Sequence, residues 1–359
     1  MVEPFPRKLQ LIIDDILNAP SEKDTSEMIS QIAKHYERQS KHKLNQKFVS
    51  LTTEMEALQE SYKKNQDEKI KEKIRLCHIE RAIWEKAIQM RKELYSNPRY
   101  PLEGNVAEAG AFSVSKRRRK KEADGIIERK GRGSTVIRHY SNMELTVADL
   151  QVLLAMNKIW EEKGGGKEIE VSFYEIAKKL NRAKSGKTYE DIKNSLLTLF
   201  RTEIKFENFL LNGEKIKTQF IHIMQGVGEL ESGEKARVRF TDYIYDSLQS
   251  GFFIYISMAV MEDLSSSAAQ GLYPFVAAQA TKGINEWYLN ELFTTVNITA
   301  PRPSERSQAI INAFEEMKEF EIISDYKVYT DESGADKLQI EPSPILMNSK
   351  PLLWISNNP

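Results

Sequence analysis

Apolar residues recur every three or four positions over residues 21–97, and this stretch contains neither glycine nor proline. A long segment without helix breakers, rich in Glu, Lys and Gln, is typical of α-helix. The spacing is interrupted at 62–69 (YKKNQDEK), which predicts a break between two helices. We therefore predict a helical arm over 1–97, either an antiparallel hairpin or a long helix that pairs with a partner chain. Its role is packing or, alternatively, oligomerisation or docking of another protein.

From residue 145 onward, helical and strand-like periods alternate. Thr146 and Ser172 are predicted N-caps of two helices, and the glycines at 164–166 stop the first of them. The predicted elements are a helix over 147–163, a strand over 168–173, a helix over 173–181, a turn over 182–187, a helix over 188–203 and strands over 204–211, 215–225 and 235–240. The order helix, strand, helix, turn, helix, hairpin is that of a winged helix.

The same order of elements recurs between 251 and 345. The predicted elements there are a strand over 253–257, a helical stretch over 258–281, helices over 287–297 and 305–320, and a hairpin over 321–341. The residues echo as well, since EIAKKLN at 175–181 aligns with ELFTTVN at 291–297. Self-similarity of this kind predicts one supersecondary unit used twice. The predicted fold is α+β and mainly helical, with winged helices over 141–250 and 251–345 and a tail over 346–359.

Residues 98–140 differ in character from both neighbours. Between 116 and 138 there are ten basic and three acidic residues, including the run Lys116, Arg117, Arg118, Arg119, Lys120 and Lys121. A run of like charges repels itself and is typical of a flexible segment. We expect a flexible basic linker that contacts a polyanion, because Lys and Arg release counterions when they neutralise phosphates.

The amino-acid composition restricts the class of protein but does not indicate what the protein binds. The chain has 359 residues, 40% hydrophobic and 29% charged, with a formal net charge of zero, so only the distribution of charge is informative. The single cysteine, Cys77, permits neither an intramolecular disulfide nor a cysteine-based zinc cage. The N-terminus lacks a signal-peptide pattern, and no apolar run has the length of a transmembrane helix. We expect a cytoplasmic protein.

Residues 184–191 (KSGKTYED) resemble a phosphate-binding loop but lack its context. A P-loop has a glycine five residues before Gly-Lys-Thr, after a buried strand, whereas Asn181 stands there after a helical segment. The stretch instead fits the turn and first residues of a DNA-recognition helix, whose N-terminus suits a phosphate. Ser185 or Thr188 can cap that helix. The predicted DNA-binding residues are Lys184, Lys187, Thr188, Asn194, Thr198 and Arg201, on the face opposite a core of Tyr189, Ile192, Leu196, Leu199 and Phe200.

The second unit offers fewer cations. Residues 251–345 hold six basic and fourteen acidic residues. Candidate DNA contacts at the start of its long helix are Arg302, Ser304, Arg306 and Gln308, whereas Glu315, Glu316 and Glu319 further along repel phosphates. Either only the tip of this helix enters a groove, or this copy packs against protein.

No pattern of catalytic or metal-ligating residues stands out. The five histidines form no metal spacing with one another or with Cys77, and no His-x-His of a nicking enzyme is present. We therefore assign no catalytic residue, metal or cofactor and expect a binding protein rather than an enzyme.

The motifs ELTVADLQVLLAM, VSFYEIAKKLN, SGKTYEDIKNSLLTLFRTEI, ELFTTVNIT and SQAIINAFEEM resemble plasmid replication initiators. The similarity covers about 140–345 and is to the iteron-binding Rep type, especially replication initiator protein A. It implies tandem winged helices that bind repeated origin sites, help melt them and recruit host helicase or initiator proteins. It also implies a dimeric form that represses its own promoter. In such proteins the C-terminal winged helix carries the main base contacts, which the acidic second unit here does not match.

We expect a plasmid replication initiator that binds duplex DNA. One alternative is a winged-helix transcriptional regulator that dimerises through its N-terminal helices. Another is a helical scaffold whose winged helices bind protein.

Overall fold

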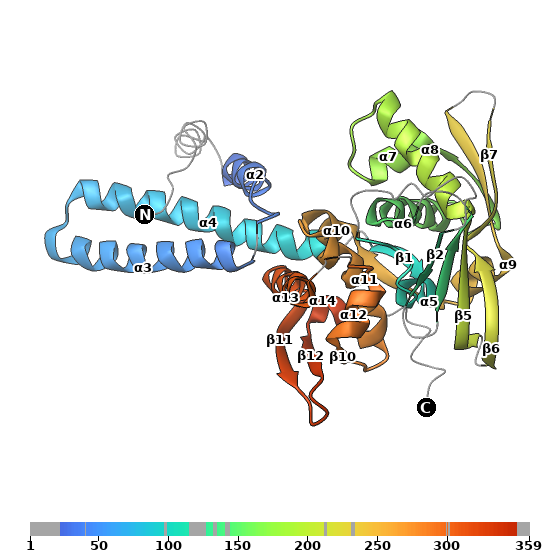
Figure 1. The fold of residues 1–359 in the computed structure, drawn as a ribbon. Helices are drawn as coiled ribbons and strands as arrows, with labels where there is room; N and C mark the ends of the chain where they lie inside the picture. The colour runs from blue at the N-terminus through green and yellow to red at the C-terminus, as the bar shows by residue number, and fades with distance from the viewer. Residues whose placement is uncertain are drawn as a thin grey trace. The chain divides into compact units, whose positions relative to one another are not determined.

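The computed structural model describes residues 22–39, 41–96, 99–114, 127–131, 135–140, 144–211, 214–230, 234–298, 300 and 302–349 (Figure 1). The chain forms two compact units, residues 1–97 and residues 98–359. Among the described residues, no helix is long and apolar enough to span a bilayer.

The described part of the first unit contains helices and short connections but no strand. It contains α2 (Glu22–Ala33), α3 (Lys41–Asn65) and α4 (Glu68–Ser96). The chain reverses at Gln66, whose φ of 45° is left-handed, so α3 and α4 form an antiparallel hairpin. The predicted hairpin and its break within 62–69 are confirmed.

Heptad spacing explains how α3 and α4 pair. On each helix, the residues that face the other helix recur at intervals of four and three positions. On α3 they are Leu44, Phe48, Leu51, Met55, Leu58 and Tyr62. On α4 they are Ile70, Ile74, Cys77, Arg81, Trp84 and Ile88. Helix α2 covers a second stripe of α4, so that Ile32, Ile83 and Ala87 are fully buried. The sequence did not predict the break between α2 and α3, where no glycine or proline stands.

The second unit contains a first winged helix. Its elements are α6 (Val147–Glu162), β4 (Glu168–Ser172), α7 (Phe173–Lys179), α8 (Gly186–Phe200), β7 (Met224–Glu229) and β8 (Lys235–Phe240). The strands form one antiparallel sheet in the order β4-β8-β7. The predicted N-caps Thr146 and Ser172 both form capping boxes, with Asp149 and Glu175.

A hairpin is inserted between α8 and the wing. Strands β5 (Thr202–Leu211) and β6 (Glu214–His222) join β2 (Ile127–Lys130) and β3 (Val136–His139) in a sheet of order β2-β3-β5-β6. The predicted single strand 215–225 is therefore two strands, β6 and β7, in different sheets. The chain changes sheet at the buried residue Ile223.

A second winged helix repeats the topology of the first. Its elements are α11 (Ser267–Thr281), β10 (Glu286–Tyr288), α12 (Leu289–Thr295), α13 (Pro303–Glu319), β11 (Ile323–Thr330) and β12 (Asp336–Pro342), with strand order β10-β12-β11. In both copies the third strand lies between the first two. Asn181 and Asn297, aligned from sequence, follow equivalent helices with φ values of 50° and 52°. Two predicted boundaries were wrong: β10 occupies the expected helix start at 287, and the stretch 258–281 is two helices.

Three short helices and one strand complete the unit. They are α9 (Asp242–Gln249), β9 (Phe253–Ser257), α10 (Met258–Asp263) and α14 (Pro344–Met347). Strand β9 was expected to open the second winged helix, but it pairs instead with β1 (Arg99–Glu103) outside both three-stranded sheets.

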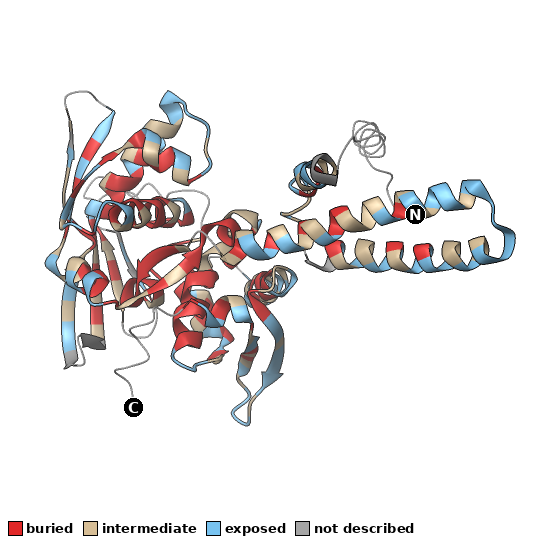
Figure 2. Ribbon diagram, turned by 180° about the vertical axis from the view of Figure 1, so that it is seen from behind, coloured by how far each residue is buried: buried red, intermediate tan, exposed pale blue. Residues whose placement is uncertain are grey.

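The segment 98–140 is not simply a flexible linker, which corrects the expectation for its described residues. After β1 come α5 (Gly104–Glu108) and residues 109–114; we call 99–114 the strap. The strap is almost wholly buried, because its small side chains fit between the winged helices (Figure 2). Ser113 N donates to Leu145 O at 2.8 Å, and Val114 N donates to Val296 O at 3.1 Å. Strands β2 and β3 are also ordered, whereas the run 116–121 lies outside the described residues.

Replacing Gly110 by alanine tests the strap. Gly110 has a φ of +64°, and a Cβ there would lie 2.3 Å from the backbone oxygen of Thr295. We expect a loss of about 2 kcal/mol or more in the free energy of unfolding, from left-handed strain and overpacking. Urea denaturation measures it. The matched control is Gly186→Ala, since Gly186 has no positive φ and no atom lies within 4 Å of the place its Cβ would take. Equal stability of the two variants would contradict the tight approach.

A buried carboxyl anchors the start of α5. Glu103 is 2% exposed and caps α5 by accepting from Val106 N at 2.7 Å. Tyr243 OH donates to its Oε1 at 3.1 Å, and Asn105 Nδ2 does so at 3.2 Å. Burial nevertheless dominates and raises the pKa of Glu103 to about 7.

This raised pKa predicts a pH dependence of stability. Between the ordinary pKa of 4.5 and the folded pKa of about 7, the folded chain binds the proton more tightly than the unfolded chain. The contribution of Glu103 to the free energy of unfolding is therefore fully present below pH 4.5 and is lost as pH rises through 7. The loss is on the order of 3 kcal/mol. Glu103→Gln should remove this loss, measured by urea denaturation from pH 5 to 8. Asp246→Asn, at an exposed position, is the control; parallel profiles for wild type and Glu103→Gln would refute the assignment.

Candidate nucleic-acid interface

Helices α7 and α8 and the turn between them form a helix-turn-helix. The turn is held by Arg182, whose backbone N donates to Ala177 O at 2.9 Å and whose Nη2 donates to Gln151 Oε1 at 2.7 Å. Ser185 is the N-cap of α8, because its side chain accepts from Thr188 N at 3.2 Å. Of the two caps that the sequence allowed, the structure uses Ser185, and Thr188 Oγ1 lies 3.0 Å from its hydroxyl.

Helix α8 has one buried and one exposed face. The buried residues are Ile192, Ser195, Leu196, Thr198 and Leu199; the exposed ones are Lys187, Glu190, Asp191, Asn194 and Phe200, with Arg201 exposed at the C-cap. Two placements from the helical period were wrong. Thr198 is only 4% exposed and Phe200 is 37% exposed.

Local hydrogen bonds at the C-terminal end of α8 satisfy the polar groups of the buried Thr198. Its Oγ1 donates to Asn194 O at 2.8 Å, and Thr202 Oγ1 donates to Thr198 O at 2.7 Å. Strand β3 adds the bond from Tyr140 N to Arg201 O at 2.8 Å. The part of α8 open on its outer face is therefore its N-terminal half, from Lys187 to Asn194.

A lysine and a tyrosine lie beside the N-terminus of α8. Lys184 Nζ donates to Tyr174 OH at 3.0 Å and lies 4.3 Å from the ring centroid. This hydrogen bond, with the charge of Lys184, lowers the pKa of Tyr174, which is 41% exposed. Sequence reasoning found Lys184 but missed Tyr174, whose position depends on the turn. Together with the free N–H groups of α8, the pair makes this corner suited to an anion.

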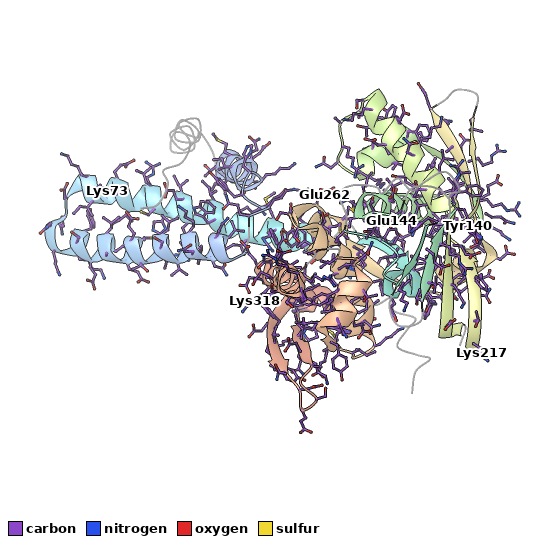
Figure 3. All side chains as sticks on the ribbon, viewed as in Figure 1. Lys73, Tyr140, Glu144, Lys217, Glu262 and Lys318 are labelled. Carbon is purple, nitrogen blue, oxygen red and sulfur yellow. The ribbon has the colours of Figure 1, made fainter. Side chains whose placement is uncertain are left out.

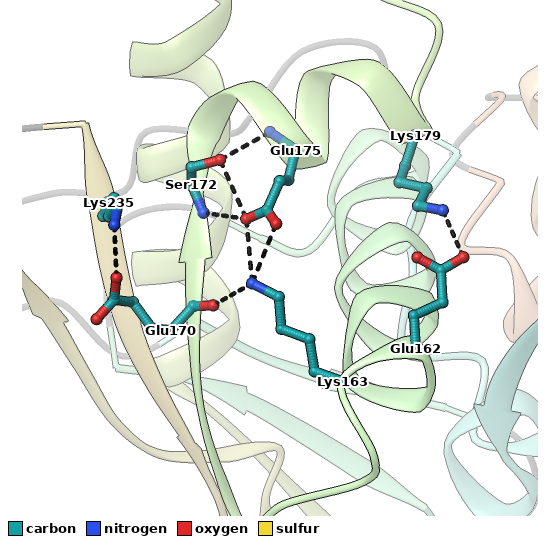
Figure 4. A network of polar contacts seen from close by, with 7 residues as sticks. All are labelled: Glu162, Lys163, Glu170, Ser172, Glu175, Lys179 and Lys235. Atoms are coloured by element: carbon teal, nitrogen blue, oxygen red, sulfur yellow. Dashed lines mark hydrogen bonds and ion pairs between the residues drawn. The ribbon is translucent and has the colours of Figure 1, made fainter.

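Elsewhere on this winged helix, cations are matched by carboxylates (Figure 4). Lys235 on β8 contacts Glu170 on β4 at 2.8 Å, and Lys163 contacts Glu175 at 3.1 Å. Lys179 of α7 contacts Glu162 of α6. The first two pairs lie at the sheet and the start of α7, and the third joins the ends of α6 and α7, so these three lysines are each matched by a carboxylate.

The outer face of the β2-β3-β5-β6 sheet carries exposed aromatic residues. Phe220 is 49% exposed, with Arg138 at 5.8 Å and Lys205 at 6.0 Å from its ring centroid. Tyr140 stacks on His222 at a centroid distance of 6.1 Å. Figure 3 places Tyr140 near the base of the β5–β6 hairpin and Lys217 toward its far end. The alternation along 214–222 was visible in the sequence, but the cross-strand neighbours were not.

Most side chains at the N-terminal tip of α13 are exposed, but several of them contact neighbouring residues of the same segment. Arg302 Nη1 lies 3.8 Å from Glu305, and Gln308 Nε2 donates to Asn312 Oδ1 at 2.8 Å. Arg306 is half-buried, and its Nε donates to Ala300 O at 2.6 Å, which closes the preceding turn. Ser304 is exposed.

Two of the three glutamates in the second half of α13 accept hydrogen bonds from other elements of the same winged helix. Glu316 accepts from the backbone N of Ser266 at 3.1 Å at the start of α11, and Glu315 accepts from Tyr326 OH at 3.0 Å. Glu319 is exposed. The face of α13 thus keeps its acidic character beyond the tip.

A comparison with known protein families finds a match that includes the first winged helix. Residues 135–277, from the start of β3 into α11, match the family described as "Initiator Replication protein, WH1" (Rep3_N). This segment of the chain is similar to the WH1 domain of initiator replication proteins. The resemblance inferred from the motifs is confirmed over this segment. The WH1 match begins inside the segment expected to be a linker, which agrees with the ordered strand β3.

Solved structures are similar at low identity. Domains 2 and 3 of RctB, as the selenomethionine derivative, share 14% identity with a TM-score of 0.43, covering 66% of this chain and 98% of that chain. A second structure of RctB domains 2–3 shares 12% identity with a TM-score of 0.42, covering 68% and 98%. The Pi initiator protein in complex with iteron DNA shares 14% identity with a TM-score of 0.39, covering 55% and 91%. No curated protein sequence matches the chain.

No group of three or more His, Cys, Asp or Glu side chains suited to a metal occurs among the described residues of either unit.

Substitutions on α8 separate its exposed from its buried positions. We expect Lys187→Ala and Arg201→Ala to weaken binding to all duplexes alike and each to reduce the salt slope by about 1, because each removes a phosphate contact. Thr198→Ala should instead lower the free energy of unfolding by about 1 kcal/mol through its lost hydrogen bond. Salt titrations of duplex binding and urea denaturation measure the two effects. An unchanged slope in both the lysine and the arginine variant would place the interface elsewhere.

Proposed function

We propose that this protein initiates plasmid replication by binding duplex DNA at repeated origin sites. The observation that carries the proposal is the WH1 match over 135–277, together with an α8 whose N-terminal half is exposed. The free N–H groups at the start of α8 and the cations of Lys184 and Lys187 beside them suit the phosphates of a duplex.

The geometry of α8 suggests a role for each exposed side chain. Lys184 and Lys187 lie at the N-terminal corner, where phosphate contacts fix a recognition helix in register. Asn194 is exposed two turns further along and can pair with adenine N6 and N7 in the major groove. Arg201 is exposed at the C-cap of α8, and we propose that it contacts a phosphate.

We propose that the second winged helix contacts DNA only through the tip of α13. Arg302, Ser304 and Gln308 are exposed there, whereas the carboxylates of Glu315 and Glu319 are exposed further along and repel phosphates. The base-reading role would then fall mainly on the WH1 domain. The basic run 116–121 adds sequence-independent affinity.

The proposal also includes contacts of this chain with other proteins. A dimer that represses its own promoter and a contact with host helicase or initiator proteins follow from the family resemblance. The first unit is the segment that we propose for such protein contacts, because the WH1 match does not include it.

The decisive experiment joins binding with replication. DNA upstream of the coding sequence is offered to the full chain, the retained fragments are sequenced, and their affinities are measured across salt concentrations. We expect tandem direct repeats and an affinity that falls steeply with salt. A plasmid that carries the repeats should then be maintained only when the chain is supplied. Asn194→Ala should cost about 1–3 kcal/mol at one base pair of each repeat.

The other outcomes point to named alternatives. Binding and promoter repression without plasmid maintenance would favour a transcriptional regulator. Absence of duplex binding at low salt would leave only a protein-binding scaffold.

A further inference from the structure

The acidic side chains between 147 and 207 fall into two groups. Eight of them contact a cation or a hydrogen-bond donor: Asp149, Glu161, Glu162, Glu168, Glu170, Glu175, Glu203 and Glu207. Figure 4 shows three of these carboxylates with their partners. The other two, Glu190 and Asp191, make no hydrogen bond or ion pair with any described residue, although Asp191 attracts the more distant Arg182.

Both unpaired carboxylates lie on the open half of α8. At 100° per residue, Glu190 and Asp191 fall on the same exposed arc as Lys187 and Asn194, one turn from each. Glu190 stands between the phosphate-type contact at Lys187 and the base-type contact at Asn194. It therefore occupies the middle of the surface that would enter a major groove.

A carboxylate at that position has two opposite effects on DNA binding. It repels the phosphate backbone, so it lowers affinity for duplexes in general. Facing base edges, it accepts a hydrogen bond from cytosine N4, whereas the O6 and N7 acceptors of guanine offer it no donor. Repulsion of the wrong partner combined with attraction of the right one raises specificity at the expense of affinity.

We propose that Glu190 is a specificity-determining residue that selects cytosine at one base pair of the bound site. The inference rests on the proposed function and extends it, since it assigns discrimination to a carboxylate rather than to the cations around it. The neighbouring carboxylate of Asp191 adds to the repulsion, while its charge also favours the charged form of Arg182.

The test uses the full chain and a pool of synthetic duplexes with a randomised central segment. The duplex enriched by the wild-type chain is remade with each base pair changed in turn, and binding is measured for wild type and variants. At one position wild type should prefer cytosine by about 5- to 150-fold. Glu190→Ala should abolish this preference and bind unselected duplexes more tightly than wild type does. Glu190→Gln should shift the preference toward adenine, which glutamine pairs with.

Asp246→Asn is the matched control, because Asp246 is an exposed acid on α9, in the same unit, and its carboxylate bonds to no other described side chain. It removes the same charge and should leave every base preference unchanged. If Glu190→Ala binds DNA with wild-type preferences at every position, or if Asp246→Asn has the same effect as Glu190→Ala, the inference is overturned. If wild type enriches no duplex, the proposed function fails first and the inference falls with it.

Discussion

The pairing of the strap with both winged helices is the constraint on which the second unit depends. Strand β1 bonds along β9, Asn157 Nδ2 donates to Pro101 O at 2.9 Å, and Ser113 and Val114 bond to Leu145 and Val296. These contacts bury backbone from three distant parts of the sequence and satisfy its polar groups, which would otherwise cost free energy. Because Gly110 lies against Thr295 backbone, the contact tolerates little side-chain volume. Two modules that share a topology are thereby packed as one unit.

Within that unit, several exposed cations form ion pairs with carboxylates. Exposed ion pairs contribute little stability, but each cancels a charge that would act on an approaching polyanion. Lys163, Lys179 and Lys235 are matched in this way, whereas the exposed N-terminal half of α8 keeps unmatched groups of both signs. A net charge of zero is thus compatible with a locally defined binding face.

The two winged helices share a topology but differ in what their long helices contact. Both have the strand order first-third-second and an asparagine with positive φ after the equivalent helix. In the second copy, Glu315 and Glu316 bond to Tyr326 and to the start of α11, so part of the face that is open in α8 supports the fold in α13. The acidic composition of this copy therefore has a structural cause at two of its positions.

Elements whose cause is local could be predicted from the order of residues. Capping residues fixed the starts of α6 and α7, the absence of breakers fixed α3 and α4, and the repeated order of elements revealed two winged helices. Features that depend on distant neighbours were visible only in the folded chain. Tertiary packing ordered the strap and strands β2 and β3, split 215–225 between two sheets, and buried Thr198 near the end of α8, where β3 pairs with β5. Helical periodicity reports which side of a helix is polar, but burial depends on what packs there, and that information lies far along the chain.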